Sequence, residues 1–227
     1  MPYISSFGSI TEDIELVRDD TSNLIGVNNN IPSKFYAEFG MAAIDTTNVW
    51  TETIIGTATT SITNQDEKRL GTLQATANGA KASLGTTNKV FSKANGAITL
   101  TGRYKVVQAG TGYGTGMFGL CNTVTGNGYT DLMAFDVSGT GITIQTQKNT
   151  ISTTNANVIV ATTTNIYYNF KIVLNSDWTE VKYYIDDVLM ATTTTNIPDD
   201  VILYLFIKVY RNNTGNVTSY IDKVGVK

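Results

Sequence analysis

The last third of the chain, residues 167–227, limits the fold most strongly, because strand-like runs follow one another there without helical periodicity. Tyr168–Leu174 and Val181–Ile185 are rich in β-branched and aromatic residues, and the polar segment NSDWT at 175–179 separates them. A second tight turn follows at Asp186-Asp187. This pattern is typical of consecutive β-hairpins and predicts an all-β fold with sheets packed face to face.

The 227 residues suffice for one large all-β domain and a short appendage. Residues 1–34 contain the densest acidic cluster and a polar NNN run, and we interpret them as an N-terminal arm with short strands at 10–17 and 24–27. An isolated hairpin is marginal in water, so the arm is expected to dock on a partner surface. From Phe35 to Lys227, turn signals recur about every ten residues, which predicts an antiparallel β-sandwich of the jelly-roll type.

The strands expected in the sandwich share alternating or continuous apolar patterns. They cover residues 51–63, 71–77, 89–92, 98–108, 115–122, 131–137, 142–147, 151–161, 168–174, 181–185, 201–210 and 218–226. Residues 98–106 alternate cleanly between apolar and polar, which predicts one buried and one wet face. Residues 201–210 are apolar on both faces, so this strand is either central between packed layers or covered by another chain. The second alternative predicts a homo-oligomer.

Composition excludes several functional classes. The formal net charge is −3 with 15% charged residues, so the chain has no basic surface for nucleic acid and no polybasic membrane patch. No segment is long and apolar enough for membrane insertion, and the first residues predict no cleaved export signal. The absence of His removes the commonest general base and zinc ligand. The lone Cys121 lies in an apolar run and is expected to be a small buried hydrophobe.

Two glycine-containing segments, residues 110–116 and 126–129, suggest a ligand-binding rim. Tyr113 and Tyr129 lie in these segments, and together with Trp178 they could stack on a glycan. The alternative for the segments is a pair of mobile loops with one anchoring tyrosine. For Trp178, as for Trp50, the alternative is a place in the core or at an interface.

The segments YNFKI at 168–172, Trp178, VKYYIDDVLMAT at 181–192 and YIDKVGV at 220–226 resemble concanavalin A-like lectin/glucanase (LamG-like) jelly-roll domains. The resemblance covers roughly residues 35–227. The hairpin of that family usually reads Y-I-D-G-x-L-V-A-T. Asp187 stands in place of the glycine, and Asp tolerates the left-handed backbone conformation. The resemblance implies a two-sheet sandwich and specifies topology more than function.

Glucanases of that superfamily carry an E-x-D-x-E strand, which aims its carboxylates into one cleft. The chain has no such strand, and its acidic pairs Asp186-Asp187 and Asp199-Asp200 are expected to form turns. We therefore predict a protein that is not an enzyme and has no catalytic residues. The metal site of legume lectins uses a His, which this chain lacks, and no metal or cofactor is predicted. Calcium held by Asp side chains and backbone carbonyls is the alternative, although the sequence has no EF-hand-like spacing.

The arm, the jelly-roll body, the Thr/Asn/Gly-rich composition and the lack of an export signal together favour a virion structural protein of a phage or similar virus. Such a subunit would serve as a capsid decoration, head-fibre or tail adhesin protein. It would assemble in the host cytoplasm, bind other virion proteins through its arm, and serve host attachment, with cell-surface glycans as candidate ligands. The alternative is a stand-alone carbohydrate-binding module or lectin, which needs no arm and is monomeric.

Overall fold

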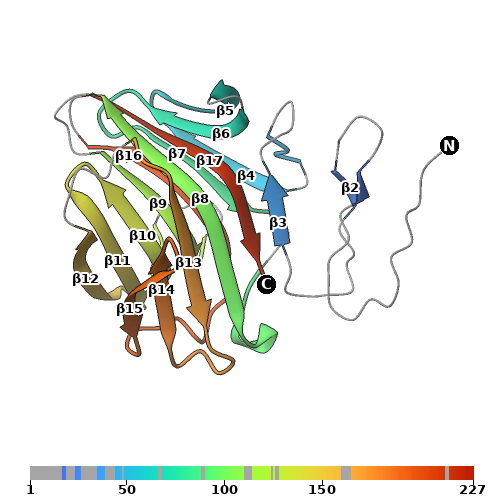
Figure 1. Ribbon diagram of the computed structural model, residues 1–227, viewed down its shortest axis with the longest axis vertical. Helices are drawn as coiled ribbons and strands as arrows, with labels where there is room; N and C mark the ends of the chain where they lie inside the picture. The colour runs from blue at the N-terminus through green and yellow to red at the C-terminus, as the bar shows by residue number, and fades with distance from the viewer. Residues whose placement is uncertain are drawn as a thin grey trace.

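The computed structural model describes residues 17–18, 24–26, 35–38, 44–47, 49–65, 68–87, 90–109, 114–123, 125, 128–159, 165–212 and 215–227. Within these residues the chain forms two large antiparallel sheets that face each other, with one short 3₁₀ turn at Lys93–Asn95 (Figure 1). The predicted all-β sandwich is confirmed. In the described part of the chain, no helix has the length and apolar character needed to cross a membrane.

The first sheet has seven strands in the order β12-β11-β10-β9-β16-β7-β4. These strands are β4 (Trp50–Ile55), β7 (Lys81–Thr86), β9 (Gly114–Cys121), β10 (Leu132–Ser138), β11 (Gly141–Lys148), β12 (Ile151–Ile159) and β16 (Tyr204–Arg211). Strand β16 is central, because β9 and β7 pair with its two sides.

The second sheet has eight strands in the order β15-β14-β13-β8-β17-β6-β5 with β3 beside β17, and it faces the viewer in Figure 1. Its strands are β3 (Phe35–Glu38), β5 (Ala58–Gln65), β6 (Lys68–Ala75), β8 (Ile98–Ala109), β13 (Tyr168–Leu174), β14 (Val181–Ile185), β15 (Val188–Thr193) and β17 (Asn216–Val226). In the predicted arm, β1 (Val17–Arg18) pairs with β2 (Leu24–Gly26), and residues 10–16 lie outside the described residues.

Alternate residues of both sheets fill the space between them. Phe118 and Phe135 from the seven-stranded sheet meet Phe170 and Tyr183 from the other, with ring centroids 4.6 Å apart for Phe135 and Phe170 and 5.4 Å apart for Phe135 and Tyr183. These rings are fully buried, and burial of each contributes roughly 2 kcal/mol of hydrophobic stabilisation. The aromatic contacts therefore hold the sheets in register.

Two of the expected strands differ in the structure. Residues 51–63 form two strands, β4 and β5, because the chain turns at Gly56, whose φ is 65°, and passes from one sheet to the other. For the expected strand at 89–92, residue 89 lies outside the described part, and Phe91 forms an isolated bridge with Leu203. Strand β7 was not predicted, because KASLGT has weak β-propensity; Ala82 and Leu84 hold it in place by filling the core.

Candidate functional site

The outer face of the seven-stranded sheet carries a row of side chains from five strands. The pairing register aligns Thr143 of β11, Asp136 of β10, Met117 of β9, Lys208 of β16 and Ser83 of β7. Successive side chains of a strand point to opposite faces of the sheet, so these residues face away from the core that their strand neighbours fill. We call this set the central row.

A second row lies beside the central row. It contains Ser138 of β10, Thr115 of β9, Tyr210 of β16 and Lys81 of β7. All four side chains are half-buried, and the Lys81 ammonium lies 5.0 Å from the centroid of the Tyr210 ring. The two rows together present hydroxyl groups, two lysines and one carboxylate.

Asp136 is the carboxylate of the central row. The Thr115 side chain forms a hydrogen bond with it, whereas its buried Oδ1 has no hydrogen-bond partner among the described residues. Burial raises the pKa of Asp136 to about 6, although the Thr115 hydrogen bond and the charge of Lys208 act in the opposite direction. A buried acceptor oxygen of this kind costs folding free energy and is suited to a ligand donor.

Lys208 lies on the other side of Met117 from Asp136. Its side chain is buried, and its Nζ lies 5.2 Å from the centroid of the Tyr129 ring. Burial and the nearby charge of Lys81 lower the pKa of Lys208 to about 8. Perturbed titratable groups of opposite sign that share one face are a common mark of functional sites.

Tyr129 covers a small apolar cluster on the same outer face. The cluster contains the buried side chains of Met117, Cys121, Leu132, Ala134 and Phe206. The Tyr129 ring lies 6.2 Å from that of Phe206, and its hydroxyl donates to the Met117 sulfur at 3.5 Å. Tyr129 therefore covers the second apolar face of β16 within the same chain. The apolar pattern of residues 201–210 does not require a second subunit. Cys121 is fully buried, as predicted, and burial raises the pKa of its thiol to about 12.

The segment that carries Tyr129 is attached to the sheet at both ends. Asn122 donates to Thr130 Oγ1 at 2.8 Å and to Asp131 Oδ2 at 3.0 Å, and Asp131 Oδ1 accepts from the Asn149 amide at 3.0 Å. Farther along the sheet, the Ser83 hydroxyl donates to the Thr125 carbonyl at 2.5 Å. These bonds place the Tyr129 segment across strands β10, β9, β16 and β7.

The three residues of the predicted rim do not form one described site. Tyr129 lies on the outer face, and Tyr113 lies outside the described residues. Trp178 is a core residue: it is 1% exposed, and its indole nitrogen donates to the Gly96 carbonyl at 2.8 Å. Its ring has no exposed side on which a sugar could stack, because it is packed among the other core side chains. Trp50 is likewise 1% exposed and packed in the core.

Sequence reasoning missed Asp136 and Lys208. The signal was present, because Asp136 alternates with the apolar Phe135 and Val137 and therefore must face away from the core. The acidic pairs singled out in the sequence lie in turns, and the E-x-D-x-E pattern requires three acids, whereas Asp136 is a single acid inside an apolar strand. Lys208 falls in a run that had been interpreted as apolar on both faces.

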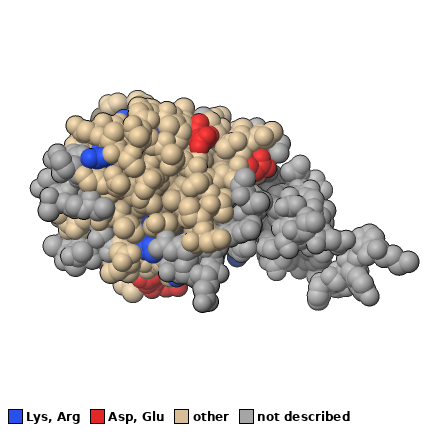
Figure 2. Space-filling view, turned by 90° about the horizontal axis from the view of Figure 1, so that it is seen from above, with Lys and Arg blue, Asp and Glu red and all other residues tan. Residues whose placement is uncertain are grey.

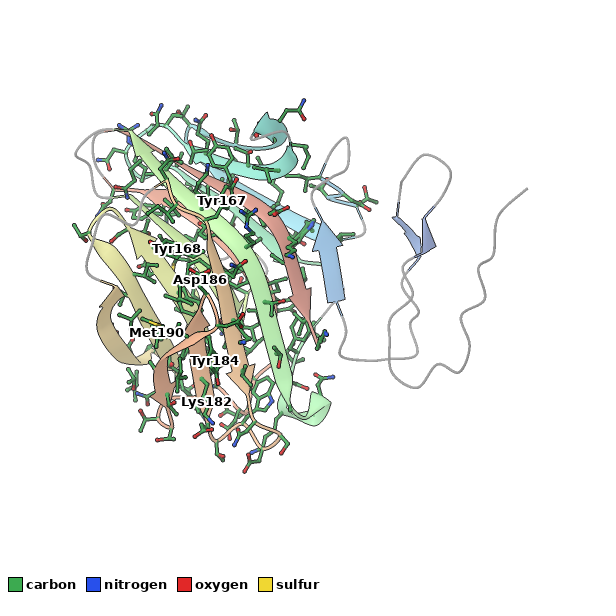
Figure 3. All side chains as sticks on the ribbon, viewed as in Figure 1. Tyr167, Tyr168, Lys182, Tyr184, Asp186 and Met190 are labelled. Atoms are coloured by element: carbon green, nitrogen blue, oxygen red, sulfur yellow. The ribbon has the colours of Figure 1, made fainter. Side chains whose placement is uncertain are left out.

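The outer face of the eight-stranded sheet is different in character (Figure 3). Cations lie beside tyrosine rings here too, with Lys171 4.6 Å from the Tyr184 ring and Arg103 4.3 Å from the Tyr167 ring, but these cations also pair with carboxylates. Arg103 also pairs with Asp222 at 2.7 Å. Lys171 likewise pairs with Asp187 at 2.5 Å. Because these cations are paired with carboxylates, this face is a suitable control surface. Among the described residues, charged side chains are also sparse on the side of the molecule that Figure 2 shows.

The two rows contain only one carboxylate, Asp136. Hydrolysis of a glycosidic bond uses two, separated by about 5 to 9 Å. In the part of the chain that the structure describes, no group of three His, Cys, Asp or Glu side chains could hold a metal ion. The arrangement is chemically suited to binding a polar ligand through hydroxyls, one carboxylate and two ammonium groups.

Comparisons with known proteins agree with this architecture. A model of the family described as "SO2946-like, C-terminal domain" matches residues 68–222. The crystal structure of SO2946 from Shewanella oneidensis MR-1, a protein of unknown function, is similar with a TM-score of 0.60 and 16% identity over 86% of each chain. A search of curated proteins gives no match.

Other similar structures come from carbohydrate-related proteins. The GH16 protein of the mixed linkage glucan PUL (MLGUL) of Bacteroides ovatus, in complex with a G4G4G3G product, has a TM-score of 0.59. Its identity is 15% over 85% of this chain and 99% of that one. The carbohydrate recognition domain of Emp46p has a TM-score of 0.58 and 12% identity over 85% and 95%. These similarities confirm the concanavalin A-like lectin/glucanase fold and give no support for a virion component.

Proposed function

The chain belongs to the family of SO2946-like C-terminal domains, and we propose that it is a non-catalytic carbohydrate-binding sandwich whose ligand lies on the outer face of the seven-stranded sheet. The observation that carries this proposal is the buried Oδ1 of Asp136, which has no hydrogen-bond partner among the described residues and lies in a row of polar side chains beside Tyr129. A sugar hydroxyl would satisfy this acceptor, and the exposed part of the Tyr129 ring would pack on the apolar face of a sugar.

The fold comparisons support sugar binding, because one similar structure contains a glucan product and another is a carbohydrate recognition domain. Two observations support a non-catalytic role. The sequence contains no E-x-D-x-E strand, and the outward positions of β10 are Leu132, Ala134, Asp136 and Ser138, with one carboxylate among them. A single positioned acid cannot serve as both acid/base and nucleophile.

A glycan array followed by isothermal titration calorimetry tests the proposal. Wild-type protein should bind at least one glycan, and Tyr129→Ala and Asp136→Asn should each weaken that binding at least tenfold. Tyr184→Ala, on the opposite outer face, is the matched control and should bind as wild type does. The proposal fails if no glycan binds, or if Tyr184→Ala loses binding while Tyr129→Ala and Asp136→Asn retain it.

A second part of the proposal concerns residues 1–34. We propose that this arm attaches the domain to a larger assembly, with the chain as a repeated subunit of a virion that displays the sandwich outward. The acidic composition of the arm supports this part, as does strand β3, which follows the arm in the sequence and pairs with β17 at Lys223–Val226.

Light scattering coupled to size-exclusion chromatography separates this assembly role from a stand-alone module. A discrete oligomer of the full chain that is lost on deletion of residues 1–34 supports the assembly role. A full-length monomer that retains glycan affinity contradicts it and leaves the lectin or carbohydrate-binding module as the function.

A further inference from the structure

The face proposed above also indicates which class of sugar it selects, and this step rests on the proposed function. We infer that the ligand is an acidic glycan that contains uronic acid, with the sugar carboxylate bound by Lys81 and Lys208 and a ring hydroxyl bound by Asp136. The inference depends on how charge is distributed across the two rows of the outer face.

The two lysines come from adjacent strands and lie close together on this face. Lys208 of β16 pairs with Ser83 of β7, and Lys81 is two residues before Ser83 on the same strand, so both lysines point outward. Each ammonium is positioned over a tyrosine ring, Lys208 over Tyr129 and Lys81 over Tyr210. The cations are thus held by aromatic rings in neighbouring rows of one surface.

The local charge differs in sign from that of the whole chain. The two rows contain Lys81, Lys208 and the single carboxylate Asp136, which gives a local balance of +1, whereas the whole chain has a formal net charge of −3. An anionic group would therefore meet a net positive face.

The positive charge of Lys81 repels that of Lys208. The nearby charge of Lys81 contributes, after burial, to the lowered pKa of Lys208. A ligand carboxylate between the two ammonium groups would relieve this repulsion and form charge-assisted hydrogen bonds. A neutral sugar would leave the repulsion in place, so the face should discriminate between a uronate and the corresponding neutral hexose.

The other half of the face suits the hydroxyl groups of the same sugar. Across Met117 from Lys208, Asp136 presents its buried Oδ1, and Thr115 and Ser138 add hydroxyls in the next row. A uronic acid carries a carboxylate at one end of its ring and hydroxyls along the other side. It therefore matches a face with cations on β7 and β16 and acceptors on β9 and β10.

Calorimetry at pH 7 with matched ligands tests this inference. The probes are hexasaccharides of galacturonate, of mannuronate and of alternating glucuronate, together with each compound after chemical reduction of its carboxyls to alcohols. Wild-type protein should bind at least one uronate ten times more tightly than its reduced form, and the difference should shrink in 0.5 M salt. Lys81→Met and Lys208→Met should each remove most of this preference, so that the ratio of the two affinities falls toward one.

Lys182→Met, on the opposite sheet, is the control and should behave as wild type. Because Lys208 is buried, its substitution could disturb packing, and the more exposed Lys81→Met then gives the decisive comparison. Equal affinity for uronate and reduced hexasaccharide, with Tyr129 still required, overturns the acidic-sugar inference and leaves the proposed function intact. Absence of any glycan binding overturns both the inference and the proposed function. Loss of uronate binding in Lys182→Met alone assigns the site to the other face and also contradicts both.

Discussion

Gly102 of β8 lies directly against the ring of Phe118 of β9, so that a Cβ added at Gly102 would lie 2.4 Å from Phe118 Cζ. The two strands belong to opposite sheets. Phe118 therefore crosses the core and reaches the backbone of the facing strand, and the sheets can approach each other only because residue 102 has no side chain.

Gly102→Ala should lower the free energy of unfolding by about 1–3 kcal/mol, because the new methyl group has no space beside an aromatic ring held in a packed core. Urea denaturation gives the value. Gly139→Ala is the matched control and should cost little, because its nearest neighbour is the flexible amide end of Gln108. The double variant Gly102→Ala/Phe118→Leu should lose less free energy of unfolding than the sum of the two single losses. A double variant whose loss equals that sum would contradict the contact.

The stability of the protein should depend on pH through Asp136. Its pKa is raised from 3.8 to about 6, so between these values the native state holds more protons than the unfolded state. The free energy of unfolding should fall as pH rises from about 4 to 6 and then level off. Asp136→Asn should lack this slope and be more stable than wild type at pH 7 by on the order of 2 kcal/mol.

The measurement is denaturant unfolding at several pH values, with carboxyl carbon NMR to follow Asp136. Thr115→Val is a second variant, because loss of its hydrogen bond to the carboxylate should raise the pKa of Asp136 further. The slope should then extend to higher pH. Parallel pH profiles for wild type and Asp136→Asn would show that Asp136 does not control this dependence.

The turn between β14 and β15 should contribute to stability and leave glycan binding unchanged. Asp186 and Asp187 both have positive φ, 48° and 64°, and Asp186 Oδ1 accepts from the amide and the side chain of Asn169 at 3.0 and 2.8 Å. Asp186→Ala should cost about 1–2 kcal/mol, because it removes these bonds and strains the turn.

Asp187→Ala and Asp187→Gly form a matched pair for the second position of the turn. The alanine variant should be less stable than wild type. The glycine variant should be at least as stable as wild type, because only glycine adopts the left-handed conformation without cost. Thermal unfolding measures both. A glycan array that lost its signals for either variant at unchanged melting temperature would assign this turn to the binding site instead.

Trp178→Phe should lower stability by about 1–3 kcal/mol, because it removes the hydrogen bond to the carbonyl of the half-buried Gly96. Glycan affinity should not change, because the indole is 1% exposed. Chemical denaturation and calorimetry on the same samples separate the two effects. Normal stability with lost glycan binding would restore Trp178 to the predicted rim.

Part of the candidate site could be read from the sequence. Tyr129 was selected from its glycine-containing segment, and the structure places it beside Lys208. Asp136 and Lys208 could have been assigned to the outer side of their strands from alternation alone. Their proximity could not, because it depends on β10, β9 and β16 lying side by side, although residues 136 and 208 are far apart in the chain.

Short segments of the chain specify the all-β class, the hairpin at Asp186-Asp187, the burial of Cys121 and the absence of an E-x-D-x-E strand, because local propensity and the period of two are encoded within a few residues. Packing between distant segments sets three further features: β4 and β5 lie in different sheets, Trp178 is packed in the core, and Tyr129 covers β16. Those features depend on which strands become neighbours, and strand order results from packing between residues distant in the chain.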